Sequence, residues 1–119
     1  MPMKKFLVLY LAPVTVLEEW MKTDPETRKT EEKKMQEEWS AWMKEHGSAM
    51  KETAGAGKTK RVSKDGITDI KNDVMLFSMV EAESPEEVAK MFESHPHLGI
   101  PEATIEIMPV NSLPGMEQL

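Results

Sequence analysis

The chain has 119 residues, a net charge of −6, eleven methionines and no cysteine. This length suits one domain, which we predict to span residues 1–119. The acidic balance argues against nucleic acid and anionic membrane surfaces as partners, because both require a basic footprint. The lack of cysteine excludes disulfides, thiolate zinc ligands and a thiol nucleophile. We expect a cytoplasmic protein, because the apolar N-terminal run is too short for a membrane span and no signal cleavage site follows it.

The first predicted element is a strand over residues 4–11, with the sequence KKFLVLYL. Successive side chains of a strand point to opposite faces of a sheet. Both faces of this strand are apolar, which is typical of a strand covered on two sides. One face carries Phe6, Val8 and Tyr10, and the other carries Leu7, Leu9 and Leu11.

Two helices are predicted next. Thr15 followed by Glu18 fits a capping box and predicts a short helix over residues 14–23. Asp24 suits the N-cap of a second helix, which Gly47 ends. The second helix is densely charged except for one apolar stripe at helical spacing, which is formed by Met35, Trp39, Trp42, Met43 and His46.

Trp39 and Trp42 lie on that stripe. Tryptophans at helical spacing belong to a hydrophobic core more often than to a cofactor site. We expect at least one of the two to line a ligand pocket between the second helix and the sheet.

Residues 47–73 are rich in Gly, Lys and Asp, and their structure is left open. Either Met50–Thr53 or Lys58–Val62 could pair as an edge strand, and the lysines would protect such an edge from further pairing. The tripeptide at residues 64–66, Lys-Asp-Gly, signals a turn. We expect a mobile loop somewhere in this region.

The C-terminal third has clearer signals. Residues 74–82, VMLFSMVEA, predict a strand that is apolar on both faces. A helix follows with Ser84 at its N-cap and Glu87 three residues later. Pro96 ends that helix, because a proline disfavours helical backbone at the residue before it. Residues 104–110, TIEIMPV, predict the last strand.

The predicted order is βαββαβ. This order indicates a ferredoxin-like α+β fold, in which the helices cover one face of an antiparallel sheet. The second face of the sheet would then expose a large apolar patch, and such patches usually mark an interface. A homodimer that packs two sheets face to face is the preferred solution, because two-fold dimers are the commonest oligomers.

Three stretches resemble a known family: MKKFLVLYLAP, the Trp-rich helix that ends in Gly, and MLFSMVEAESPEEVAKMFESHPHLGIPEATIEIMPV. Together they are similar to the YCII-related family of the dimeric α+β barrel superfamily, most closely over residues 77–110. The resemblance implies a dimeric α+β barrel. It names no single chemistry, because the superfamily includes cofactor-free oxygenases, dehalogenating lyases and isomerases.

The chain departs from the family pattern at two places. Studied family members carry a His–Asp pair with the histidine on the first helix, and residues 14–23 contain no histidine. Members with a DGPF motif carry it before the third strand, whereas this chain keeps Asp65-Gly66 without the Pro-Phe. The catalytic dyad of the family is therefore not carried over.

His95 and His97 are the main candidate site residues. In an extended segment they would point the same way, and one of them could act as a general acid or base near neutral pH. They could instead share a divalent metal with Glu93, Glu102 or Glu106, although two histidines alone are not a specific metal signal. A third interpretation is a helix-terminating loop whose histidines cap carbonyls or face water.

Three functions stay open, one of which is a metal-binding dimer that uses the two histidines. The first is a small-molecule enzyme without a cofactor, in which His95 or His97 shuttles a proton and Tyr10 and Glu106 assist from neighbouring strands. Its pocket would lie between the sheet and the helices. The alternative is a noncatalytic ligand-binding or assembly domain whose main role is the homodimer. No metal ligand is assigned.

Overall fold

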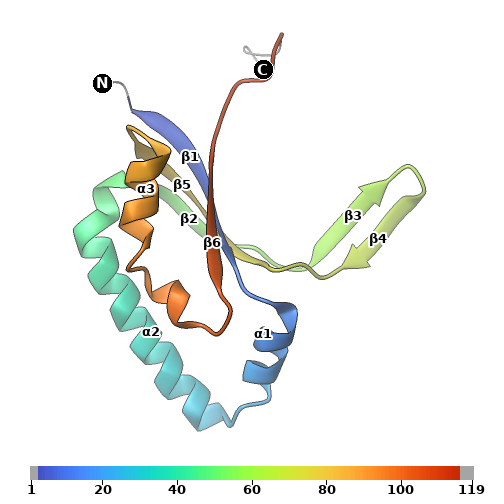
Figure 1. Cartoon of the computed structure of the whole chain (residues 1–119). Coiled ribbons are helices and arrows are strands. Elements are labelled where there is room, and N and C mark those ends of the chain that lie inside the picture. The colour runs from blue at the N-terminus through green and yellow to red at the C-terminus, as the bar shows by residue number, and fades with distance from the viewer. Residues whose placement is uncertain (1–2, 116–119) are drawn as a thin grey trace.

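The computed structural model describes residues 3–115, and Figure 1 shows the arrangement of their elements. This part of the chain contains six strands, three α-helices and two short 3-10 helices. Their order is β1 (Lys4–Leu11), α1 (Val14–Met21), α2 (Pro25–His46), η1 (Gly47–Ala49), β2 (Met50–Gly55), β3 (Thr59–Ser63), β4 (Gly66–Ile70), β5 (Val74–Ala82), α3 (Pro85–Phe92), η2 (Pro96–Gly99) and β6 (Thr104–Pro109).

The main sheet has four strands in the order β2-β5-β1-β6, and every neighbouring pair is antiparallel. If the β3–β4 hairpin is left out, the strands and main helices follow the βαββαβ order. Helices α2 and α3 lie on the same side of the sheet (Figure 1). The predicted ferredoxin-like α+β class, with an antiparallel sheet and helices on one face, is confirmed.

The helix-facing side of the sheet forms the core. Phe6, Val8 and Tyr10 of β1 are fully buried there, as is Val80 of β5. The alternate β1 residues remain partly exposed on the opposite side, as the strand alternation predicts. We call these two sides the covered face and the open face. The buried core cluster consists of Phe6, Val8, Tyr10, Trp42, Val80, Ala82, Val88 and Phe92.

Two of the three predicted helix caps are present. The Asp24 carboxylate accepts a hydrogen bond from the Thr27 backbone N–H at 3.2 Å. The Ser84 hydroxyl oxygen accepts one from the Glu87 backbone N–H, also at 3.2 Å. These bonds satisfy N–H groups that the first turn of a helix leaves without a partner.

The predicted cap at Thr15 is wrong. Helix α1 begins at Val14, as the predicted range has it, but Pro13 is in the N-cap position and there is no side-chain cap. Pro13 has a fixed extended backbone, and its carbonyl accepts the first helical hydrogen bond, from the Val16 N–H. Thr15 therefore lies inside the helix, which ends at Met21 and not at residue 23.

Residues 47–73 form more regular structure than expected. β2 pairs with β5 at the edge of the main sheet, so the edge strand predicted at Met50–Thr53 is present. Residues 58–62 take no part in that edge, because β3 pairs instead with β4 in a separate two-stranded sheet. The turn predicted at residues 64–66 joins these two strands. Figure 1 shows the hairpin projecting from the side of the sheet opposite α2 and α3.

Candidate functional site

His95 owes its position to the proline that follows it. Its backbone is extended, with φ −67° and ψ 136°, and Pro96 opens the 3-10 helix η2. The His95 side chain caps this short helix, because its Nδ1 accepts a hydrogen bond from the His97 backbone N–H at 3.0 Å. Local sequence therefore turns the His95 ring back over its own loop and toward the core.

The His95 ring lies inside an aromatic cluster. It is only 2% exposed. The centroid of Trp39 lies 4.3 Å from the His95 centroid in an edge-to-face arrangement, and that of Trp42 lies 4.6 Å away. Tyr10 and Phe92 complete the cluster at 5.3 and 5.4 Å. We use the name aromatic cluster for His95 and these four rings.

The protonation state of His95 follows from this environment. Burial, followed by the nearby His97 and His46, lowers the pKa of His95 to about 4, so the ring is neutral at physiological pH. Its Nδ1 accepts the His97 N–H, so the single ring proton is on Nε2. Within residues 3–115 that Nε2 has no hydrogen-bond partner, although it is buried.

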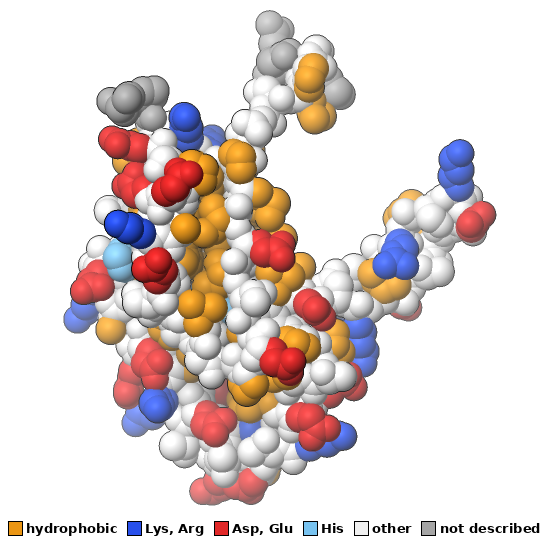
Figure 2. All heavy atoms as spheres, viewed as in Figure 1, with side chains coloured by type: hydrophobic (Ala, Val, Ile, Leu, Met, Phe, Trp, Pro, Cys, Tyr) orange, Lys and Arg blue, Asp and Glu red, His pale blue; other side chains and the backbone are white. Residues whose placement is uncertain are grey.

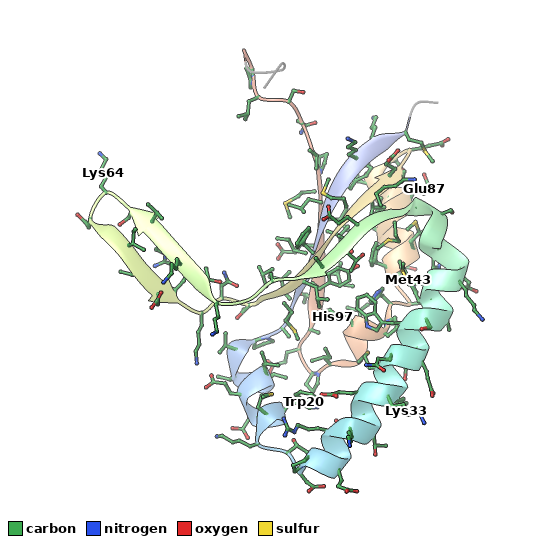
Figure 3. All side chains as sticks on the ribbon, turned by 180° about the vertical axis from the view of Figure 1, so that it is seen from behind. Trp20, Lys33, Met43, Lys64, Glu87 and His97 are labelled. Carbon is green, nitrogen blue, oxygen red and sulfur yellow. The ribbon has the colours of Figure 1, made fainter. Side chains whose placement is uncertain are left out.

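His97 has a different role in the structure. It is 1% exposed, and its Nε2 donates a hydrogen bond to the Leu11 backbone carbonyl at 2.9 Å. Burial lowers the pKa of His97, while backbone hydrogen bonds with Leu11 and Thr104 oppose that shift. Figure 3 shows His97 in the space between the sheet and α2. This ring ties the η2 loop to the end of β1 and thereby holds the backbone N–H that orients His95.

Tyr10 begins a chain of hydroxyl groups along the covered face. Its phenol oxygen lies 2.7 Å from the Ser78 Oγ, which in turn lies 2.7 Å from the Thr53 Oγ1. Ser78 is fully buried, whereas Thr53 is exposed at the edge strand β2. Burial raises the pKa of Tyr10, and the Ser78 hydrogen bond partly offsets this rise. The chain therefore connects a buried phenol to the surface across three strands.

Five of the six predicted site residues gather in one place. Tyr10, Trp39, Trp42, His95 and His97 are within ring-contact distance of one another or of a shared neighbour. Trp42 is anchored by its Nε1, which donates a hydrogen bond to the Met91 carbonyl at 3.1 Å. Their catalytic and binding roles remain predictions.

The sixth residue, Glu106, does not join them. It lies opposite Leu9 on the open face, while its neighbour Ile105 lies opposite Tyr10 on the covered face. A one-residue step along a strand reverses the side-chain direction, so adjacent strands alone do not bring Glu106 to Tyr10. The expectation that Glu106 assists Tyr10 at the histidines is corrected.

Ser78 and Thr53 were missed by the sequence reasoning. Ser78 is a polar residue within the otherwise apolar run VMLFSMV, and it occupies a position on the buried face. A buried hydroxyl requires a hydrogen-bond partner. A serine at a core position of the strand was therefore the sequence signal that could have pointed to these hydroxyl groups.

A cleft of about 1120 Å³ lies between α1, the N-terminal half of α2 and residues 96–102. None of the six predicted residues lines it, but Pro96 between the two histidines does, and so does Glu38 next to Trp39. The rings of the aromatic cluster do not line the cleft. Apolar side chains on the walls include Ala12, Val16, Leu17, Trp20, Met35, Met75 and Ile100.

Residues 3–115 contain neither a cluster of metal-binding side chains nor a membrane-spanning helix. No group of three or more His, Cys, Asp or Glu side chains is arranged to hold a metal ion in this described range. No helix in the same range is long and apolar enough to span a membrane.

Comparison with known proteins indicates the fold. No family model and no curated protein sequence matches the chain. Among solved structures it is similar to 5-chloro-2-hydroxyhydroquinone dehydrochlorinase (TftG) from Burkholderia phenoliruptrix AC1100, in complex with 2,5-dihydroxybenzoquinone. The TM-score is 0.55 at 13% identity, with 93% of this chain and 97% of that chain covered.

A second solved structure, an unknown protein from Galdieria sulphuraria, has a TM-score of 0.36 at 10% identity and covers 94% of this chain and 47% of that one. At 13% identity, the likeness to the dehydrochlorinase establishes only that the two proteins share an α+β fold.

Proposed function

We propose that the chain is a small-molecule enzyme that needs no organic cofactor and that uses His95 at its reactive centre. The observation that carries this proposal is the buried, unpartnered Nε2 of His95 within the aromatic cluster. An unpaired buried polar group costs about 1–3 kcal/mol, so a ligand that pairs with it would recover that cost.

The geometry favours a hydrogen-bond donor over a general base. With its Nδ1 occupied and a pKa of about 4, neutral His95 presents an N–H at Nε2. A neutral imidazole N–H can stabilise negative charge that develops on a substrate oxygen, because the group is already oriented. His97 is then a positioning residue, since its backbone N–H holds the His95 ring.

Tyr10 supplies the proton route in this proposal. If its oxygen accepts a proton from the substrate, its own proton passes to Ser78, the Ser78 proton passes to Thr53, and Thr53 releases one to solvent. Each hydroxyl ends with one proton, so the transfer balances. The two 2.7 Å contacts of the hydroxyl chain support this route.

The cleft provides the way in. Its walls include Pro96, which follows His95 in the chain, and Ala12, which follows Leu11. They also include Glu38, which precedes Trp39. A ligand in the cleft would reach His95 after a displacement of the half-buried Trp39 side chain. Oxygenated aromatic molecules are the proposed substrate class, because aromatic rings surround His95 and because the similar dehydrochlorinase is in complex with 2,5-dihydroxybenzoquinone.

The test is ligand binding and turnover with a panel of hydroxylated aromatics and quinones, followed by tryptophan fluorescence and native mass spectrometry. His95→Phe should weaken binding about tenfold or more, as expected for the loss of one buried hydrogen bond. His95→Gln keeps an N–H donor and should retain part of the affinity. Equal binding and turnover in wild type, His95→Phe and His95→Gln would refute the proposal.

A noncatalytic assembly domain is the second candidate, and the open face favours it. Leu9 lies between Phe77 of β5 and the β6 edge strand on this face, and all three strands contribute apolar side chains to it. Figure 2 shows hydrophobic side chains exposed along β6 and on the side away from α2 and α3. The apolar set on the open face is Leu7, Leu9, Phe77, Met79 and Met108.

The accessible surface of the whole chain is also large. The chain has 8933 Å² of accessible surface, whereas a compact monomer of its 13.5 kDa mass has about 6,500 Å². We propose a face-to-face dimer of open faces, which serves either candidate function. Leu9→Glu should abolish it in sedimentation equilibrium, and a wild type that stays monomeric at high micromolar concentration would exclude it.

Three further assignments belong to the proposal. Membership of the YCII-related family is supported by the order of strand, helix, histidine loop and strand over residues 77–110. We also propose that residues 1–119 form one domain and that the protein is cytoplasmic. The location is supported by the lack of cysteine in the chain.

A further inference from the structure

The β3–β4 hairpin forms an arm, which we define as residues 58–70. Its strands pair in an unbroken register from Thr59–Ile70 to Ser63–Gly66, and the main sheet contains neither strand. Gly66 has φ +126°, a conformation that suits glycine at this tight turn. Figure 3 shows Lys64 at the tip of the arm, far from the rest of the molecule. A two-stranded hairpin alone is at best marginally stable in water, so the arm needs a contact.

One face of the arm is suited to such a contact. Val62 and Ile67 lie directly opposite each other, and they are 76% and 69% exposed. The next pair on the same face is Lys60 and Asp69, whose side chains form an ion pair at 2.7 Å. This face therefore combines an apolar patch with an ion pair whose charges cancel. Burial of such a face against a protein surface would be favourable.

The charge of the arm is opposite to that of the remaining chain. The arm carries a net charge of +2 and the rest of the chain carries −8, which together give the total of −6. The arm contains four basic residues, Lys58, Lys60, Arg61 and Lys64, and two acidic residues, Asp65 and Asp69. A second copy of this chain therefore presents a surface of complementary charge to the arm.

The direction of the arm also fits a second copy. In Figures 1 and 3 the arm leaves the sheet on the side opposite α2 and α3, which is the side of the open face. Its five-residue strands extend about 16 Å at ~3.3 Å per residue, and stacked sheets lie about 10 Å apart. An arm of this length can pass beyond a sheet stacked on the open face.

From these observations we propose that the arm clamps the second copy that docks on the open face. The Val62–Ile67 face packs on the partner, and Lys58 and Lys64 at the two ends of the arm meet acidic surface there. This inference rests on the proposed dimer, but it assigns to the arm a role that the dimer itself does not require.

The experiment measures dimer dissociation by sedimentation velocity across a concentration series. Ile67→Glu should raise the dissociation constant about tenfold or more, because it places a charge within the packed face. Thr68→Glu is the charge-matched control, because it makes the same change in net charge on the other face of the arm, opposite Arg61, and so measures the effect of the charge alone. It should change the constant less than about threefold, as rim charges do.

Hydrogen exchange gives a second readout that does not depend on substitution. The amides of residues 59–70 should become more protected as the wild-type concentration rises through the dissociation constant. A dimer that Leu9→Glu disrupts but Ile67→Glu leaves intact, with arm protection independent of concentration, refutes the clamp and leaves the dimer standing. A wild type without any dimer refutes both.

Discussion

The two faces of the main sheet contain similar side chains with different surroundings. On the covered face, Phe6 and Val8 are fully buried by helices of the same chain. On the open face, Leu7 and Leu9 are equally apolar but remain partly exposed, although they belong to the same strand. The difference shows that hydrophobicity requires each face to be covered, whereas the helices of this chain cover only one of the two faces.

The largest predicted effect compares a phenylalanine on each face. Phe6→Ala should lower the free energy of unfolding by about 3–5 kcal/mol, because it leaves a cavity in a closely packed core. Phe77→Ala, on the open face, should cost much less in dilute protein and should cost more as the concentration rises, because the proposed dimer would bury that side chain. Urea denaturation at two protein concentrations measures both effects.

An equal, concentration-independent loss in these two variants would contradict the distinction between the faces. Val80→Ala on the covered face provides a control, because its neighbours come from the same chain at any dilution.

The second prediction concerns pH and the covered face alone. His95 binds a proton near its ordinary pKa of 6.5 when unfolded and at about 4 when folded. Between these values the unfolded state binds more protons, so the free energy of unfolding should fall as the pH drops from about 6.5 to about 4. The full contribution is about 3 kcal/mol.

Denaturation curves at pH 7, 5.5 and 4 of wild type and His95→Gln measure this term. The variant should lose less stability over that range. Val80→Ala is the control, because it destabilises the same core and leaves all three histidines in place. A pH dependence that is identical in wild type and His95→Gln would contradict the assignment.

The smallest predicted effect concerns the hydroxyl chain. Ser78→Ala should cost about 1–3 kcal/mol, because it leaves the buried Tyr10 hydroxyl without its 2.7 Å partner. Thr53→Val should cost less than about 0.5 kcal/mol, because Thr53 is exposed and surface substitutions are usually tolerated. Thermal unfolding of both variants at pH 7 tests the order of the two effects. A larger loss in Thr53→Val would mean that the chain is not organised around Ser78.

Several features could be predicted because their signals are local. The caps at Asp24 and Ser84 depend on bonds that span three residues, and both are present. The extended backbone of His95 follows from the ring of Pro96. The cap predicted at Thr15 was wrong, because a capping-box pattern competes with a preceding proline. Pro13 determines the start of the helix instead.

The candidate site was predictable only in part. The spacing of His95 and His97 drew attention to them, and the Trp39 and Trp42 stripe placed two rings on the core side of α2. The sequence did not indicate that His95 would cap a 3-10 helix, that His97 would bond the Leu11 carbonyl 86 residues away, or that Glu106 would point to the open face. These facts depend on strand register and loop closure, which join residues far apart in the chain.

By itself, the sequence determined the alternation of β1 and β5, two helix starts, the βαββαβ order and the apolar character of both faces of the sheet. Only the tertiary structure decided that residues 59–70 form a separate hairpin, that His95 and His97 are buried, and where the cleft lies. The physical reason is range: propensity, capping and alternation act over a few residues, whereas burial and pKa depend on the segments that pack around a group.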